Sequence, residues 1–208
     1  MQSSDESGQF FEYGQTELDV LCTADSELAQ VIRNAGILRR KITPGTFKGL
    51  VRAISGQQIS GKAHAAIWKK ITLAFNPLSP ELIAEAPEEK LRECGLSMRK
   101  SQNIKNIALE FLQGNLDDLE QLPDEELVSR LCQLKGVGKW TAEMLMIFTF
   151  QRKNILSFND LAIQRGIKII YGLESLNHVK LTELHIKYSP YATIASFYLW
   201  HIANTSPN

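Results

Sequence analysis

The chain has 208 residues and lacks several features that would place it in a familiar class. No apolar run approaches the roughly 18 residues that cross a bilayer, so no membrane span is expected. The N-terminal residues 1–8 are polar and acidic, unlike a secretory signal. The three cysteines, Cys22, Cys94 and Cys132, are odd in number and form no C-x-x-C pair. A disulfide framework or a zinc site is therefore not expected, and a reducing intracellular compartment is favoured.

Signals for β-strands are also missing, because alternating apolar patterns and Asn-Gly hairpin turns do not occur. Helix signals are frequent instead: Asp25 opens one helix and Gly36 closes it. The length suits one compact domain or two small lobes, and the connections are short. The sequence therefore predicts an all-α fold of ten or so short helices. The expected helices lie at about 25–34, 44–54, 60–75, from Pro80, from Pro87, 98–113, 123–132, 139–150, 160–171, 180–186 and 190–203.

The formal net charge is zero, but the charges are unevenly distributed along the chain. Residues 1–30 contain seven acidic residues and no Lys or Arg, whereas residues 31–70 contain nine Lys or Arg and no acidic residue. Residues 71–130 are acidic again, and residues 131–208 are basic. Solvated helix faces would explain single charges. A basic block of this length favours a surface that faces a phosphate backbone, because local charge sets the field there.

The motif that says most about function is the segment Leu134–Ala142, a hydrophobic-x-Gly-hydrophobic-Gly turn between two apolar helices. Gly136 and Gly138 allow a tight turn and a close approach to a ligand, because they have no Cβ atom. The N–H groups at the start of the second helix form a site for an anion such as a DNA phosphate. Lys135 and Lys139 add positive charge beside it.

Further motifs connect this hairpin to a known group of proteins. They are Phe47–Ser60, Gly95-Leu96-Ser97 with Arg99-Lys100, the hairpin followed by Asp160, Tyr188–Tyr191, and Ser196–Trp200. Together they cover roughly residues 36 to 203. In order and spacing the chain resembles the helix–hairpin–helix DNA glycosylases, and within them the 3-methyladenine DNA glycosylase II branch. A single GxG turn would be weak support, but this series of motifs is specific.

The resemblance implies two helical lobes with a central cleft. One lobe would comprise about residues 40–150, and the other about 15–39 plus 151–208. The N-terminal β domain of some larger relatives is not expected here, and residues 1–14 would form a mobile segment or a short strand-like arm. The endonuclease III branch carries a cysteine cluster after its catalytic region. This chain has no cysteine after Cys132, so no iron–sulfur cluster is expected.

Asp160 lies twenty residues after Trp140, at the position of the family's catalytic carboxylate. The structural alternative is an N-cap that accepts the N–H groups of residue 162 or 163, and the two roles are compatible. The helix dipole favours a negative charge at this end of a helix. A carboxylate near C1′ of a sugar would stabilise an oxocarbenium-like transition state or align water. We therefore expect Asp160 to be the catalytic residue.

Trp140 indicates the reaction subtype. In relatives that also cut the DNA strand, a lysine at this position attacks the sugar. Lys139 is adjacent, but one helical residue turns a side chain by about 100°, which aims it elsewhere. The chain therefore resembles a monofunctional glycosylase that uses water and has no lyase step. The alternative role for Trp140 is ordinary core packing.

The resemblance also predicts a base pocket. Trp140 and Trp200 match pocket positions, Met144 lies one turn after Trp140, and Phe158 and Tyr198 are weaker candidates. Alkylated purines such as 3-methyladenine are positively charged, so aromatic faces bind them by stacking and cation–π attraction. Such a base is already a good leaving group. A site with one carboxylate and no strong general acid suits this chemistry.

The remaining site residues are predicted to contact DNA. Gln57, Gln58 and Ser60 lie where relatives insert a side chain into the gap that a flipped base leaves, and Gln58 best matches the inserted position. A polar turn between helices is the alternative. The hairpin residues expected to bind DNA are Lys135, Gly136, Val137, Gly138, Lys139 and Thr141. No cofactor is expected to be required, although the family's hairpin often holds a monovalent cation through backbone carbonyls, here those of Cys132, Leu134 and Val137.

The leading hypothesis is a monofunctional DNA glycosylase of base excision repair. It would hydrolyse the N-glycosidic bond of alkylated purines in damaged double-stranded DNA. It would act as a monomer inside the cell, in the cytoplasm or nucleoid of a bacterium or in the nucleus of a eukaryote. One alternative is a non-catalytic protein that binds abasic or distorted DNA, in which Asp160→Asn would leave function intact. A glycosylase for oxidised or mismatched bases is less favoured, because the catalytic lysine and the cluster cysteines are missing.

Overall fold

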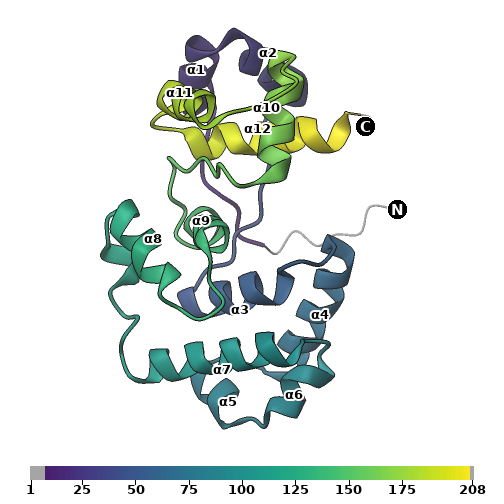
Figure 1. The fold of residues 1–208 in the computed structure, drawn as a ribbon, viewed down its shortest axis with the longest axis vertical. Helices are drawn as coiled ribbons and strands as arrows, with labels where there is room; N and C mark the ends of the chain where they lie inside the picture. Colours follow the sequence, from purple (N-terminus) through teal and green to yellow (C-terminus); the bar gives the residue numbers. More distant parts are fainter. Residues whose placement is uncertain (1–7, 207–208) are drawn as a thin grey trace. The chain divides into compact units, whose positions relative to one another are not determined.

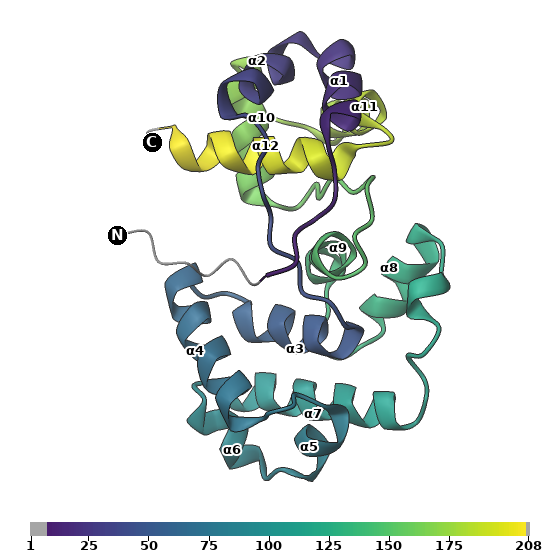
Figure 2. The same ribbon diagram turned by 180° about the vertical axis from the view of Figure 1, so that it is seen from behind.

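A computed structural model describes residues 8–206 of the chain, which divides into two compact units. The central unit is Thr43–Phe150, and the terminal unit joins the segment up to Ile42 to the segment from Gln151 onward. The described residues form twelve α-helices and one 3-10 helix, with no strand beyond an isolated bridge between Phe10 and Lys41 (Figures 1 and 2). The predicted all-α class is confirmed. Residues 1–7 of the predicted N-terminal arm lie outside the described residues.

The terminal unit is built around α12, a helix that is buried along most of its length. Its helices are α1 (Gln15–Ala24), α2 (Ser26–Ala35), α10 (Leu161–Tyr171), α11 (His178–Tyr188) and α12 (Ala192–Thr205). α10 packs against α12 at very close range: a Cβ atom added to Gly166 would lie 2.2 Å from the carbonyl oxygen of Leu199. Glycine at this position therefore sets how near the two helices come.

The sequence predicted no helix at α1, and the reason lies in the residue that precedes the helix. The N-cap is Gly14, which has no side chain to accept a helix N–H. The backbone N–H of Gly14 instead donates to Glu17 Oε2 at 3.0 Å. Burial of Leu18 and Leu21 then stabilises the helix. α1 thus depends on tertiary packing, which leaves a weak signal in the sequence.

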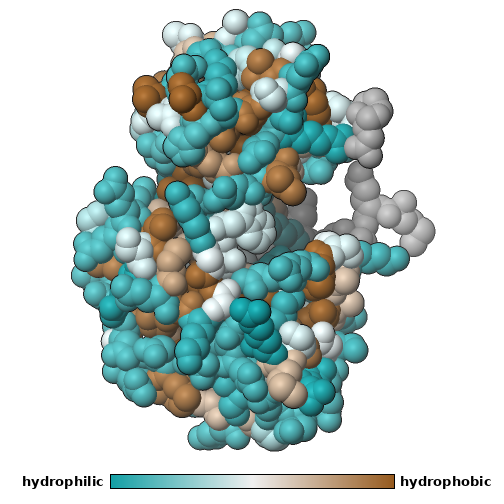
Figure 3. Space-filling view, viewed as in Figure 1, coloured by the Kyte–Doolittle hydropathy of each residue, from teal (hydrophilic) through white to brown (hydrophobic). Residues whose placement is uncertain are grey.

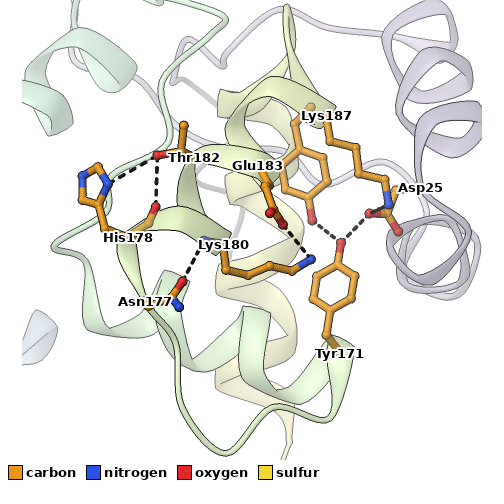
Figure 4. A network of polar contacts seen from close by, with 9 residues as sticks. Asp25, Tyr171, Asn177, His178, Lys180, Thr182, Glu183 and Lys187 are labelled. Atoms are coloured by element: carbon orange, nitrogen blue, oxygen red, sulfur yellow. Dashed lines mark hydrogen bonds and ion pairs between the residues drawn. The ribbon is translucent and has the colours of Figure 1, made fainter.

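A buried polar network joins three helices of the terminal unit (Figure 4). Asp25 is 1% exposed and caps α2 by accepting the N–H groups of Glu27 and Leu28. Its other oxygen, Oδ2, accepts hydrogen bonds from the Tyr171 hydroxyl and from Lys187 Nζ, the latter at 2.7 Å. The Tyr171 hydroxyl also lies 2.6 Å from that of Tyr188. The C-terminal end of α10 is therefore anchored to α2 and α11.

The central unit is assembled around α3 and α7. Its helices are α3 (Thr46–Gly56), α4 (Gly61–Ala74), α5 (Pro80–Glu85), α6 (Glu88–Glu93), α7 (Met98–Leu112), α8 (Asp124–Cys132) and α9 (Lys139–Phe148), with the 3-10 helix η1 (Leu119–Gln121). Phe47, Leu50 and Ile54 of α3 are buried at the predicted helical spacing. α3 begins two residues after the predicted Pro44, because Gly45 is its N-cap at φ 90°.

The surface shown in Figure 3 is mostly hydrophilic or neutral, with apolar residues scattered between polar ones. Among the described residues, none of the helices has the length and apolar character needed to span a membrane. The same residues contain no group of three His, Cys, Asp or Glu side chains able to hold a metal ion.

Candidate functional site

Asp160 is the N-cap of α10, as its position before an apolar helix predicts. The residue is 7% exposed, and Oδ1 accepts the N–H groups of Ala162 and Ile163, each at 2.9 Å. The indole Nε1 of Trp200 donates to the same oxygen at 3.1 Å. Three donors on one oxygen fix the orientation of the carboxyl group.

Trp200 connects this carboxyl group to α12. The residue is half-buried, and its ring stacks on that of Phe197, with centroids 6.2 Å apart and an interplanar angle of 26°. Gly166 of α10 faces the backbone of Leu199 of α12 with no room for a Cβ atom between them. The distance from Trp200 to Asp160 therefore depends on how tightly α10 packs against α12.

The predicted hairpin is the connection between α8 and α9. The turn is closed by hydrogen bonds from the Leu134 N–H to the Leu131 carbonyl and from the Val137 N–H to the Leu134 carbonyl. Val137 is buried and anchors the turn, whereas Lys135 and Lys139 are exposed. Gly138 caps α9 and has no side chain that could accept a helix N–H. This helix N-terminus therefore presents backbone N–H groups and two cations without a capping side chain of its own.

Glycine is required by the fold at one of the two hairpin positions and not at the other. Gly136 has φ 86°, and a Cβ atom added to it would lie 2.1 Å from Asn103 Nδ2, so both conformation and space require glycine. Gly138 has φ −92°, which any residue adopts, and a Cβ atom there would meet nothing within 4 Å. The fold itself does not explain Gly138. An absent side chain at an open helix N-terminus suits the close approach of a ligand.

The turn between α3 and α4 carries the predicted inserting residue. Gln58 is exposed and has φ 56°, a left-handed backbone conformation that residues other than glycine rarely adopt. Gln57 is half-buried, and its Nε2 donates to the Gly136 carbonyl at 2.8 Å and to Thr141 Oγ1 at 3.0 Å. The two glutamines therefore differ: one points into the hairpin and the other is exposed.

Lys100 of α7 holds the same turn. Its Nζ donates to the carbonyls of Ser55 at 3.1 Å and Gln57 at 2.6 Å, at the C-terminal end of α3 where a cation is favoured. Burial lowers the pKa of this amine. The sequence motif included Lys100 but gave it no role, because its acceptors lie 45 and 43 residues away.

Two residues predicted to bind DNA have side chains with internal roles. Thr141 is 4% exposed and accepts the hydrogen bond from Gln57, so its side chain is directed toward the α3–α4 turn. Ser60 is exposed and is the N-cap of α4, where its hydroxyl accepts the Ala63 N–H at 3.3 Å. The Ser60 cap is a local contact that a serine before a helix signals, whereas the contact of Thr141 with Gln57 joins residues 84 positions apart and has no local signal.

The predicted pocket residues are distributed over both units. Trp140 is 41% exposed and Met144 half-buried, both on α9, so core packing is not the main role of Trp140. Phe158 is half-buried and its ring lies edge-on to that of His178. Tyr198 must be corrected: it is 0% exposed, and its hydroxyl donates to the Gly36 carbonyl at 2.9 Å. It is a core residue and has no surface with which to line a pocket.

Comparison with known proteins agrees with the motifs. Residues 51–190 match the HhH-GPD superfamily of base excision DNA repair proteins. DNA-3-methyladenine glycosylase 1 of Schizosaccharomyces pombe is 34% identical over 161 residues, which make up 74% of this chain and 71% of that protein. A solved 3-methyladenine DNA glycosylase of the same organism, in complex with abasic DNA, has a TM-score of 0.81 at 30% identity, covering 89% of this chain and 95% of that one.

A second solved structure, a DNA-3-methyladenine glycosidase from Bacillus halodurans, also has a TM-score of 0.81. It is 34% identical, and the match covers 95% of this chain and 93% of that one. The predicted fold type is thus confirmed by structures as well as by sequence. The chain belongs to the HhH-GPD superfamily of base excision DNA repair proteins.

Proposed function

We propose that this protein is a monofunctional DNA glycosylase that releases alkylated purines, of the 3-methyladenine class, from double-stranded DNA. The observation that carries the proposal is the Asp160 carboxyl group, which three hydrogen-bond donors hold on Oδ1 at the start of α10. A buried carboxyl group held in one orientation is suited to stabilise an oxocarbenium-like sugar. The names of the similar proteins support the same substrate class.

In the proposed reaction the bond between C1′ and the purine nitrogen breaks, and its electron pair leaves with the base. An alkylated purine carries a positive charge, so it departs as a neutral base without a strong general acid. Asp160 stabilises the positive charge that develops on the sugar and aligns the water that adds to C1′. The products are a free base, an abasic site and the proton that the added water loses.

We propose Trp140, Met144, Phe158 and Trp200 as the residues that bind the extruded base. Exposed or half-buried aromatic faces attract a cationic purine by stacking and cation–π interaction. Trp140 also occupies the position of the strand-cutting lysine in other relatives. An indole cannot form a Schiff base with the sugar, so the reaction should end without strand cleavage.

The DNA backbone would bind to the hairpin, with a phosphate at the N-terminus of α9 between Lys135 and Lys139. The exposed Gln58 would fill the space that the flipped base leaves. The hairpin carbonyls of Cys132, Leu134 and Val137 offer the oxygen donors that a monovalent cation prefers. Leu134 also accepts the Val137 N–H, and a carbonyl has a second lone pair for a cation. Such an ion would add positive charge beside the phosphate. The protein would act as a monomer.

The test is to incubate the protein with duplex DNA treated with a methylating agent and to identify the released bases by chromatography. Release of 3-methyladenine, with an intact strand until alkali is added and no adduct trapped by borohydride, is the expected result. Binding to abasic DNA without any base release would favour the non-catalytic binder instead. A trapped covalent adduct would contradict the monofunctional mechanism.

A further inference from the structure

The α3–α4 turn and the hairpin are joined by one side chain. Gln57 Nε2 donates one hydrogen bond to the Gly136 carbonyl and a second to Thr141 Oγ1. These acceptors lie 79 and 84 residues further along the chain, on either side of Gly138. An amide nitrogen has two hydrogens, so both are used here. Gln57 therefore reaches both sides of the N-terminus of α9.

The backbone of Gln57 is held as firmly as its side chain. Lys100 Nζ binds the carbonyl of Gln57 at 2.6 Å and that of Ser55 at 3.1 Å. On the side of α4, Ser60 caps the next helix. Gln58 thus lies between a residue fixed by two elements of the fold and a helix cap.

Gln58 itself is in a conformation that its neighbours must impose. A glutamine at φ 56° is strained, and such residues persist where the surrounding structure determines them. Its side chain is exposed, so packing of the side chain does not hold the backbone in this state. The fixed points nearest to it along the chain are the hydrogen bonds of Gln57.

We infer that Gln57 is a positioning residue that couples the exposed Gln58 to the phosphate-binding hairpin. When a phosphate binds at the N-terminus of α9, Gln58 is then held in position to enter the duplex in the same step. This inference rests on the proposed function, because it takes the hairpin and Gln58 to act on DNA. It replaces the DNA contact predicted for Gln57 by a role in which this side chain binds the hairpin and does not touch the substrate.

The test uses an abasic-site duplex with 2-aminopurine opposite the gap, whose fluorescence reports unstacking when the protein inserts a residue. The variants are Gln57→Met, which keeps the length and removes the amide, Gln58→Ala, and the two combined. Thr141→Val removes one of the two acceptors at nearly constant volume. Gln121→Met, at an exposed position of η1, is the matched control and should behave like the wild type.

Gln57→Met should reduce the fluorescence change at saturating protein at least fivefold, with Thr141→Val intermediate. Binding of the duplex should weaken only a few-fold, since Lys135 and Lys139 remain. The fluorescence change of the double variant should equal that of Gln58→Ala alone, because both substitutions remove the same insertion step. A merely structural role would lower thermal stability without this lack of additivity.

Two results would overturn the inference: a wild-type fluorescence change in Gln57→Met, or effects of the two single variants that multiply in the double variant. Neither readout needs base release. If the wild type inserts Gln58 but releases no base from methylated DNA, the proposed function fails while the coupling stands.

Discussion

Two helices of this protein each begin at a candidate functional residue, and their first turns are completed in opposite ways. α10 begins after Asp160, whose buried carboxyl group accepts two N–H groups of the first turn. α9 begins after the exposed Gly138, which offers no side chain to its first turn, and the nearby Lys135 and Lys139 are exposed as well. The same backbone dipole is thus satisfied internally at one site and presented outward at the other.

The difference separates the two tasks of a DNA-processing enzyme. At α10 the protein supplies its own anion and holds it in one orientation, which a reacting group requires. In the proposed function, the N-terminus of α9 would receive an anion that belongs to the substrate. An acidic or capping residue at position 138 would therefore satisfy the first turn of α9 internally, as Asp160 does for α10.

The largest expected effect comes from removing the anion of α10. Asp160→Asn keeps an acceptor for the amides of Ala162 and Ile163 but loses the negative charge. Base release from methylated DNA should fall by roughly a hundredfold or more, as for other losses of transition-state charge stabilisation. Affinity for abasic DNA should change only a few-fold. Residual release above a tenth of the wild-type rate would remove Asp160 from the catalytic role.

The next effect comes from filling the N-terminus of α9. Gly138 has φ −92° and ψ 173°, the extended backbone of an N-cap residue. Gly138→Asp should raise stability by about 1 kcal/mol, because aspartate caps a helix well. It should also lower DNA affinity at least tenfold, by occupying and charging the phosphate site. Opposite signs in a melting curve and a DNA titration check this, and equal losses in both would contradict it.

The hairpin glycines sharpen the same comparison. Gly138→Ala should keep the melting temperature and weaken binding to damaged and undamaged duplexes alike, because only the approaching phosphate meets the new methyl group. Gly136→Ala should lower stability by at least 1–2 kcal/mol through left-handed strain, with the contact to Asn103 in addition. If Gly138→Ala binds both duplexes like the wild type, the hairpin is not the phosphate clamp.

A smaller effect on the rate of base release is expected from removing the Trp200 indole N–H, the hydrogen-bond donor that α12 provides to Asp160. Trp200→Phe keeps an aromatic ring but removes the hydrogen bond to Asp160 Oδ1. One hydrogen bond to a charged group is worth about 1.5–3 kcal/mol, and two amide donors remain. Single-turnover base release should slow by roughly tenfold. The binding of abasic DNA is the control measurement and should remain near the wild-type value.

The smallest effect concerns stability and pH at the other end of α10. Burial of Asp25 raises its pKa, but hydrogen bonds from Lys187, Tyr171 and the Leu28 amide outweigh burial and lower it below 3.8. The stabilisation is therefore present above pH 3.8 and is lost as pH falls through the lowered value. Asp25→Asn should reduce the melting temperature by a few degrees at neutral pH. The difference from the wild type should shrink in acid, and a constant difference would contradict this assignment.

How much the sequence predicted depends on how local each signal is. Asp160 before an apolar helix, the glycines of the hairpin and most helix boundaries were readable, because caps and turns are set by nearby residues. α1 was missed because Gly14 gives no capping signal. The hydrogen bonds of Gln57, Lys100 and Trp200 join residues at least 40 positions apart, so no local pattern contains them. Tyr198 was misplaced for the same reason, since its hydroxyl donates to the carbonyl of Gly36, 162 positions away.

Gly166 has a consequence for the tolerance of this protein to inherited variation. It lies six residues from Asp160 and bears no functional group, yet any Cβ atom there would meet the backbone of Leu199. Every other residue type would push α12 away and carry the Trp200 indole from the carboxyl group that it orients. A saturation scan for survival of methylation damage should therefore accept glycine alone at position 166, as strictly as it accepts aspartate at position 160.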